Sequence, residues 1–328
     1  MKHLGKLLAF IGLILAIWLF LRDDPATILA LLRQAGPGLI LAGLVHVIPM
    51  ILNAQAWRII LPGAGRPALP AMLRVVWIRE AVNGLLPVAR IGGEVASYRL
   101  LRHIGIRRAP AVASLTVDVA LSIVSQLVFA LAGVAVLVSA RGGDVQDAGH
   151  PVMLQIIGGL VLLAVLAGLF IAVQHAGLFE RLMRILNGLA AGRFETAIGH
   201  SAQIDRAVQL IYRRRGPVLG CVLWQLAGWV AGGAEIWAAL WFLGHPVGII
   251  EAIAIEAVIQ AVSSAAFLVP GALGVQEAAF LFVGAALGLE PVTALALAAA
   301  RRIRDCVIFM PGLVSWQFAE NQMVRGPR

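Results

Sequence analysis

The stretch Pro270-Gly-Ala-Leu-Gly-Val-Gln-Glu277 interrupts a long apolar segment and ends in a carboxylate. An earlier stretch, Pro87-Val-Ala-Arg-Ile-Gly-Gly-Glu94, has a proline and a glutamate at the same two places. Proline and glycine interrupt helices and free backbone groups for other partners, and a bilayer tolerates such a break only where protein or a watery cavity surrounds it. We therefore expect two broken helices that together build the functional site. The expected hairpin breaks are Pro87, Gly92, Gly93, Pro270, Gly271 and Gly274.

The composition indicates a membrane protein. Hydrophobic residues make up 60% of the 328 residues and charged residues only 13%, whereas soluble domains carry about 25% charged residues; the mean hydropathy is +0.91. Several apolar runs reach the roughly 20 residues that a helix needs to cross the hydrocarbon core, and no alternating pattern of an outer-membrane barrel is present. We predict an all-α polytopic membrane protein with a single membrane domain, 1–328.

Charge and motif content narrow the function further. The net charge is +9, but the placement of the basic residues favours anionic lipid headgroups, not nucleic acid, as the counter-charge. Cys221 and Cys306 lie in apolar segments without the spacing of a metal site or disulfide framework. The sequence has no phosphate-binding loop, dinucleotide fingerprint, zinc-ligand spacing or nucleophile elbow. We expect no cofactor, no metal and no catalytic residue.

Proline, glycine and charge divide the apolar runs into about six transmembrane helices. We expect them at 7–21, 38–61, 109–138, 152–173, 217–243 and 291–318. The segments 69–101 and 249–287 fold back at their prolines in this interpretation, as re-entrant helical hairpins. Between 178 and 215, apolar residues at helical spacing beside arginines predict a basic amphipathic helix on the cytoplasmic surface. Segment 7–21 also has features of a secretory signal, but no cleavage site follows it, so we expect a retained helix.

The basic residues set the expected orientation, because short cytoplasmic loops are enriched in lysine and arginine. With a cytoplasmic N-terminus, the outer segments hold only Arg22, Arg33 and Arg141. We predict a multi-pass protein of the bacterial inner membrane. The distance along the sequence between Pro87 and Pro270, which we call the offset, also separates Asp118 from Arg301. It relates a first repeat, 38–140, to a second, 217–318. Three expected crossings separate corresponding positions, so the two copies are predicted to be inverted, with their hairpin tips together near the midplane.

Polar side chains inside the predicted membrane segments form the candidate site, because groups at that depth normally pair, face a cavity or serve function. Arginines would bind a phosphate or carboxylate headgroup with paired hydrogen bonds, and carboxylates would position them or carry a proton. The alternative is that these groups form buried ion pairs with a structural role. The candidate substrate-binding or translocation residues are Arg79, Glu80, Asn83, Arg90, Glu94, Asp118, Glu256, Gln260, Gln276, Glu277, Arg301, Arg302 and Asp305.

Other polar residues in the predicted spans have a simpler interpretation. We expect them to make hydrogen bonds between helices and not to bind a ligand. These residues are His46, Asn53, Gln126, Gln225 and Glu235.

The stretches Asn83-Gly-Leu-Leu-Pro-Val-Ala-Arg-Ile-Gly-Gly-Glu94 and Phe267-Leu-Val-Pro-Gly-Ala-Leu-Gly-Val-Gln-Glu277 resemble the flippase-like, lysylphosphatidylglycerol synthase transmembrane superfamily. The resemblance covers about 35–318 and is strongest to the HpnL hopanoid-biosynthesis-associated membrane proteins. It implies a relative of the lipid-translocating half of enzymes that aminoacylate phospholipid and move it between leaflets. Because their soluble aminoacyl-transferase domain is not expected here, we expect no aminoacylation. Ser263 stands where the HpnL pattern commonly has arginine, which implies one headgroup-facing charge fewer.

Three hypotheses follow. The first is a flippase-like transporter that moves a lipid of the hopanoid, glycolipid or phospholipid class between leaflets, with possible proton or ion coupling through Glu94 or Glu277. The second is an assembly or regulatory subunit that recruits lipid-biosynthesis enzymes through the basic surface between Arg181 and Arg215. The third is an intramembrane lipid-modifying enzyme. The sequence leaves the lipid, its direction of travel and the oligomeric state open.

Overall fold

The computed structural model describes residues 13–22, 24–61, 66–86, 92–140, 195–266 and 269–325, and every regular element in these ranges is helical. A helix at Leu13–Arg22 comes first. The elements that follow are α2 (Pro25–Ala35), α3 (Gly38–Leu44), α4 (Val47–Ile60), α5 (Leu69–Leu85), α6 (Gly92–His103), α7 (Arg108–Ala140), α10 (Glu195–Arg213), α11 (Arg215–Phe242), α12 (Ile249–Ala265), the 3₁₀ turn η2 (Pro270–Ala272), α13 (Val275–Ala286), α14 (Pro291–Arg304), the π-helical turn η3 (Asp305–Phe309) and α15 (Met310–Arg325).

Three of the described helical segments are long and apolar enough to cross a membrane, namely Gly38–Ile60, Arg108–Leu137 and Arg215–Phe242. They coincide with three of the predicted spans, so the all-helical, multi-pass class is confirmed for the described part of the chain. The predicted span 152–173 lies outside the described residues, and 7–21 lies partly outside them. The predicted span 291–318 is not continuous α-helix, because η3 divides it into α14 and α15.

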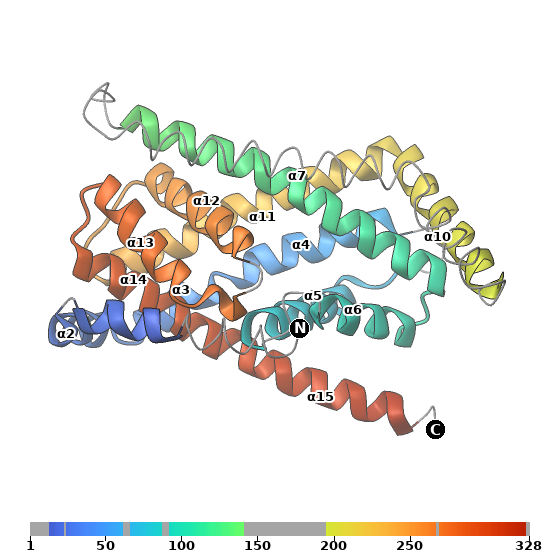
Figure 1. Ribbon diagram of the computed structural model, residues 1–328, viewed down its shortest axis with the longest axis horizontal. Coiled ribbons are helices and arrows are strands. Elements are labelled where there is room, and N and C mark those ends of the chain that lie inside the picture. Colours follow the sequence, from blue (N-terminus) through green and yellow to red (C-terminus); the bar gives the residue numbers. More distant parts are fainter. Residues whose placement is uncertain are drawn as a thin grey trace.

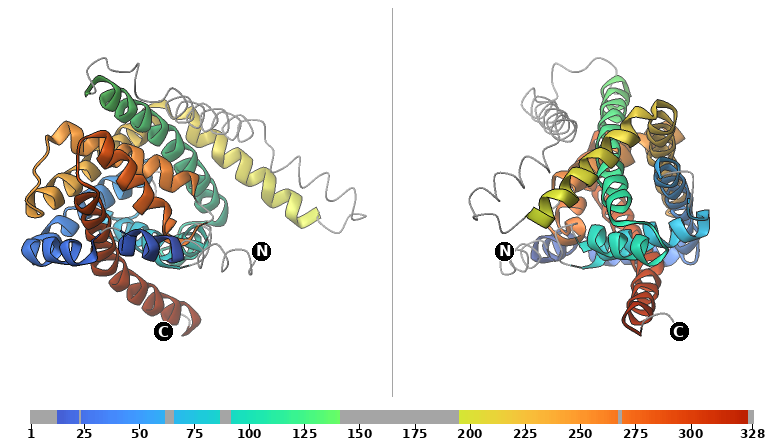
Figure 2. Two further views of the ribbon diagram at one scale, coloured as in Figure 1. Left: turned by 60° about the vertical axis from the view of Figure 1, so that its left-hand side comes forward. Right: turned by 90° about the vertical axis from the view of Figure 1, so that its right-hand side faces the viewer.

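The long helix α7 crosses most of the length of the molecule, and α10 lies at one end of the long axis while α2, α13 and α14 lie at the other (Figure 1). Helix α11 is central, since it packs against α4, α7 and α12. Arg214, just before α11, donates to the carbonyl oxygens of Ile60 and Leu61 at 3.2 and 3.4 Å, which brings the end of α4 to the α10 end. The last helix, α15, extends away from the body in both further views (Figure 2).

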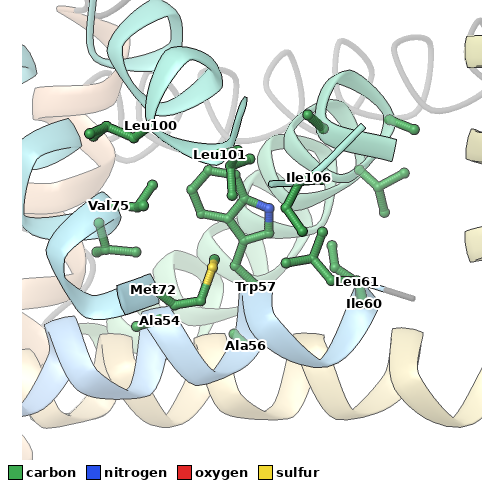
Figure 3. Packing of buried hydrophobic residues seen from close by; sticks show 14 of the residues in the cluster. Ala54, Ala56, Trp57, Ile60, Leu61, Met72, Val75, Leu100, Leu101 and Ile106 are labelled. Atoms are coloured by element: carbon green, nitrogen blue, oxygen red, sulfur yellow. The ribbon is translucent and has the colours of Figure 1, made fainter. Parts of the chain in front are cut away.

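The core consists of separate hydrophobic clusters for the two helical hairpins. Around the first hairpin, α5 and α6, the fully buried Trp57 of α4 packs among Met72, Leu100 and Leu101 (Figure 3). Around the second, α12 and α13, Phe280 lies in a cluster to which α2, α11 and α14 also contribute. Each hairpin therefore buries its apolar faces against its own set of neighbouring helices.

Several helix boundaries repeat with the offset seen in the sequence. Helices α6 and α13 begin and end at positions that the offset relates, and so do the first residues of α7 and α14. Gly105 and Gly288, a further pair at the same offset, have φ of +94° and +75° just after α6 and α13. The next residue donates back in both cases, Ile106 to the Leu101 carbonyl at 3.0 Å and Leu289 to the Gly284 carbonyl at 2.9 Å. This is the Schellman pattern of helix ends, which favours glycine in the left-handed position.

The two hairpins contact each other at their broken ends. Gly271 lies at φ +59°, and a side chain there would come within 3.0 Å of the Gly84 carbonyl oxygen at the end of α5. Within the first hairpin, a side chain at Gly93 would lie 2.5 Å from the Arg79 carbonyl oxygen, and the Gly93 N–H donates to Asn83 Oδ1 at 2.8 Å. These positions need glycine because backbones approach closely there. Of the other predicted breaks, Gly92 begins α6, Pro270 begins η2 and Gly274 precedes α13 at φ +75°, whereas Pro87 lies outside the described residues.

Candidate functional site

Charged side chains from α5, α7, α11, α12, α13, α14 and η3 are buried in the middle of this arrangement. Burying an unpaired charge is very costly, so such groups are paired with other charges or hydrogen-bonded. The buried members are Arg79, Asp118, Glu235, Glu256, Glu277, Arg301, Arg304 and Asp305. In the described part of the chain these residues form four ion-pair groups, which extend from the first hairpin to the second.

The first group joins α5 to α7. Arg79 Nη1 lies 2.6 Å from Asp118 Oδ2, and the guanidinium stacks over the Trp57 ring with its central carbon 4.7 Å from the centroid. Gln225 of α11 donates to Asp118 Oδ1 at 3.1 Å, and its own Oε1 accepts from Ser125. Asp118 thus has both carboxylate oxygens hydrogen-bonded, which offsets the loss of water around a side chain only 1% exposed.

Glu94 lies at the start of α6, beside the first group. Asn83 is close to its carboxylate, and the charges of Arg79 and Asp118 act on it. Its Oε2 is buried and has no hydrogen-bond partner among the described residues. Glu94 therefore keeps an acceptor that the described surroundings do not use. Arg90, the other predicted charge of this hairpin, lies outside the described residues.

The second group joins α12 to α14. Arg301 Nη2 forms a short contact with Glu256 Oε2, and Gln260 donates to Glu256 Oε1 at 2.7 Å. Gln126 of α7 donates to the Gln260 carbonyl oxygen at 2.9 Å and to Ser264. Arg301 also lies over the Phe280 ring at 5.4 Å, yet its Nε and Nη1 are buried without partners in the described part of the chain.

The third group holds the broken end of the second hairpin. Arg302 donates from Nε and Nη2 to Glu277 Oε1 at 2.9 and 2.8 Å, and from Nη1 to the Gly271 carbonyl oxygen at 2.9 Å. Asp305 lies 3.4 Å from the same Nη1. One arginine of α14 thus binds the 3₁₀ turn and the first turn of α13 together. Gln276, next to Glu277, donates instead to Ser263 at 2.8 Å.

The fourth group connects α5 of the first hairpin to α11, α14 and η3. Arg304 pairs with Asp305 Oδ1 at 2.6 Å and with Glu235 Oε2 of α11 at 3.0 Å. His46, between α3 and α4, lies 2.9 Å from Glu235 and 3.4 Å from Glu80 of α5. A chain of charged groups therefore runs from α14 through α11 and α4 to α5.

The first two groups are related by the offset but have opposite polarity. Asp118 and Arg301 occupy corresponding positions in α7 and α14, and each pairs with the first helix of its own hairpin. In the first hairpin that partner is the cation Arg79, and in the second it is the anion Glu256. The partners themselves do not correspond, since position 262 is valine and position 73 is leucine.

The predicted site residues contact one another in small sets. Three further residues, which the prediction left out of the site, also belong to these sets. His46 and Glu235, expected to make only interhelical hydrogen bonds, are hydrogen-bonded to each other and also belong to the charged chain. Arg304 joins them to Asp305. A charge within an apolar span was the available signal for Glu235; for His46 no sequence pattern indicates a partner on a helix so distant in the chain.

Arginines and carboxylates alternate, and the polar atoms left without a described partner in these groups are Glu94 Oε2, Glu277 Oε2 and two nitrogens of Arg301. A cavity of about 10 Å³ between Glu235 and Arg301 is lined otherwise by apolar residues of α3, α11 and α14. That volume is comparable to one water molecule.

Comparison with protein families places this sequence in a known group. The model of the lysylphosphatidylglycerol synthase TM region matches residues 6–312, nearly the whole chain. The chain belongs to this family. Membership supports a multi-pass membrane protein related to lipid synthesis or flippase proteins. The comparison with curated proteins gave no match, and neither did the comparison with solved structures.

Proposed function

We propose that this protein is a flippase-like lipid transporter of the bacterial inner membrane. It would pass a lipid headgroup between leaflets through a polar site at the midplane while the acyl or terpenoid tail stays in the bilayer. The observation that carries the proposal is the contact of the two hairpin ends at Gly84 and Gly271, with Glu94 on one side and Glu277 bound to Arg302 on the other. Family membership agrees with a lipid-related role.

The repeated helix boundaries support an inverted repeat with two re-entrant hairpins in this proposal. One hairpin would enter from the cytoplasm and the other from the outside, as in transporters whose substrate sites lie between inverted repeats. Two Arg301 nitrogens have no hydrogen-bond partner among the described residues, and guanidinium groups bind phosphate through paired donors. The favoured cargo is a lipid with an anionic headgroup; hopanoid and glycolipid cargo remain part of the proposal through the HpnL resemblance.

A leaflet assay tests the transport proposal. Purified protein is reconstituted into vesicles with a fluorescent phosphatidylglycerol, and a membrane-impermeant reductant quenches the outer leaflet. We expect Arg90→Ala, Glu94→Gln and Glu277→Gln each to slow movement of the probe at least tenfold. Glu290→Gln is the matched control, because Glu290 is an exposed carboxylate just before α14 with no side-chain cap. Wild-type rates in all three site variants would refute the site assignment.

A second candidate function is an assembly subunit for lipid-biosynthesis enzymes. An open cavity of about 440 Å³ is lined by Tyr98, Arg99, Arg102, His103, Arg108 and Met323. This basic surface would suit an acidic patch on a cytoplasmic enzyme, as would the predicted basic segment 178–215. Arg102→Gln with Arg108→Gln would then abolish co-purification of the enzyme and leave leaflet movement unchanged.

A further inference from the structure

The open cavity beside the end of α6 differs in character from the buried ion pairs. Its volume is about 440 Å³, and none of its lining residues belongs to the four ion-pair groups. Most of its lining is basic. The lining residues are Tyr98, Arg99, Arg102 and His103 of α6, Arg108 of α7 and Met323 of α15.

The positive charge at this cavity has little acidic sequence around it. No acidic residue occurs between Glu94 and Asp118, the stretch that supplies all three lining arginines. In the described part of the chain, the carboxylate that pairs with one of them is Glu320 of α15, whose Oε2 lies 2.6 Å from Arg99 Nη2. Like charges held close together repel one another. An anion in the cavity would therefore relieve this repulsion.

Two of the three guanidinium groups are held in place. Arg102 Nη1 donates to the Ile106 carbonyl oxygen at 2.7 Å. Arg99 is held by Glu320, which itself accepts a hydrogen bond from Trp316 Nε1 at 3.1 Å. Among the described residues, these contacts engage one nitrogen of each guanidinium, and a guanidinium carries five N–H donors. Donors therefore remain for a phosphate group, which arginine binds through paired hydrogen bonds.

The cavity lies where a membrane surface is expected. Arg108 is the first residue of Arg108–Leu137, one of the segments long and apolar enough to cross a membrane, and basic residues at the ends of spans lie near the lipid headgroups. Tyr98 and Met323 pack against the core cluster of the first hairpin and give the cavity an apolar side. Val95, one turn before Arg99 on the same side of α6, is 54% exposed. A ligand here would meet both cations and apolar side chains.

We propose that this cavity binds the phosphate group of an anionic membrane lipid of the phosphatidylglycerol class. The arginines bind the phosphate, and Tyr98, Met323 and Val95 contact the glycerol and the upper part of the acyl chains. Glu320 competes with the lipid for Arg99. The site is separate from the proposed translocation site, and lipid binding to it does not depend on transport. A bound lipid would contact α6, α7 and α15 together and stabilise the first hairpin against α15.

Native mass spectrometry of the full chain in detergent measures the binding, by titration with phosphatidylglycerol and with phosphatidylcholine. We expect phosphatidylglycerol to bind more tightly. Arg102→Gln with Arg108→Gln should weaken its binding at least fivefold, since each basic residue near a membrane surface contributes a factor of about five. Arg33→Gln with Arg206→Gln is the matched control, because it removes two exposed arginines outside the cavity. The control should bind phosphatidylglycerol as the wild type does.

Glu320→Gln changes the binding in the opposite direction. It removes a negative charge beside the cavity and releases Arg99 from its ion pair, so the affinity for phosphatidylglycerol should rise about twofold, as expected for a partly exposed pair. A gain in affinity cannot come from loss of folding. Unchanged or weaker binding in Glu320→Gln overturns the proposal, and so does equal weakening in the cavity variant and its control.

Three further outcomes decide what occupies the cavity. Equal binding of phosphatidylglycerol and phosphatidylcholine would mean that the anion is not recognised, which overturns the proposal. Displacement of the lipid by inorganic phosphate at the same concentration would identify a free-phosphate site instead. Wild-type lipid binding in the cavity variant, together with lost co-purification of an enzyme, would assign the surface to an acidic protein. None of these measurements requires lipid movement, so a wild type that fails the leaflet assay contradicts the proposed function alone.

Discussion

At the residue scale, Asp118 depends on a small number of contacts. It is nearly inaccessible to solvent, and its charge is balanced by Arg79 and by the Gln225 amide. A buried ion pair contributes little net stability over well-packed apolar residues, whereas removal of one partner strands a buried charge. Loss of one partner of the Arg79–Asp118 pair should therefore cost more stability than the intact pair contributes.

Arg79→Leu should destabilise the protein by about 3–5 kcal/mol, the usual cost of breaking a buried ion pair from one side. The double variant Arg79→Leu with Asp118→Leu should recover most of that loss, because neither charge of the pair is then left buried without its partner. Thermal unfolding in detergent, followed by circular dichroism, measures both. Equal destabilisation of the single and double variants would contradict the assigned pairing.

The positions of the charged residues were predictable from the sequence, but their partners were not. Asp118 and Arg301 follow from the offset, and a charge in an apolar span is a signal in itself. Arg79 and Glu256 stand at positions that the offset does not relate, so the repeat did not predict which residue of α5 or α12 forms each pair. The His46–Glu235 contact joins two helices far apart in sequence and left no local pattern.

At the element scale, close approach of helices decides where glycine is needed. A side-chain carbon at Gly133 of α7 would lie 2.3 Å from Ala257 Cβ of α12. Small residues at such crossings let helices pack by direct backbone contact in a membrane. The surroundings of Gly216, near the start of α11, are open within 4 Å as far as the described residues extend.

Gly133→Ala should therefore destabilise the protein by about 1–3 kcal/mol, as overpacking does, which exceeds the gain of about 0.5–1 kcal/mol from better helix propensity. Gly216→Ala serves as the matched control and should be neutral or slightly stabilising. Ala257→Gly added to Gly133→Ala should restore stability, since it removes the clashing atom. Unfolding midpoints in detergent compare the four proteins, and no rescue by Ala257→Gly would contradict the close α7–α12 contact.

The helices were more predictable than their interruptions. The ends of α6 and α13 follow from the glycines after them, and three spans follow from length and hydropathy. The π-helical turn Asp305–Phe309 was missed, and with it the division of the predicted span 291–318. Such turns are frequent at functional sites and have no sequence signature of their own; this one places Asp305 between Arg302 and Arg304.

At the scale of the whole molecule, the two ends of the long axis differ in charge. The loop after α6, the residues before α11 and the end of α4 carry most of the described exposed or half-buried arginines, and Arg22 and Arg33 are the described ones near α2. The excess of positive charge in cytoplasmic loops then predicts that the α10 end faces the cytoplasm.

Single cysteines test this orientation. In a background of Cys221→Ser and Cys306→Ser, we expect His103→Cys to react with a membrane-impermeant maleimide only after the cytoplasmic face is opened. Glu290→Cys should react in intact cells, because it lies between α13 and α14 at the opposite end (Figure 1). Labelling of both positions from the same side would refute the proposed topology.

The opposite polarity of the Arg79–Asp118 and Glu256–Arg301 pairs means that the two halves of this chain are not interchangeable. A symmetric dimer built from two copies of the first half would carry an aspartate at both corresponding positions, and one built from the second half would carry an arginine at both. Neither dimer would place an aspartate and an arginine at the two corresponding positions, as this chain does.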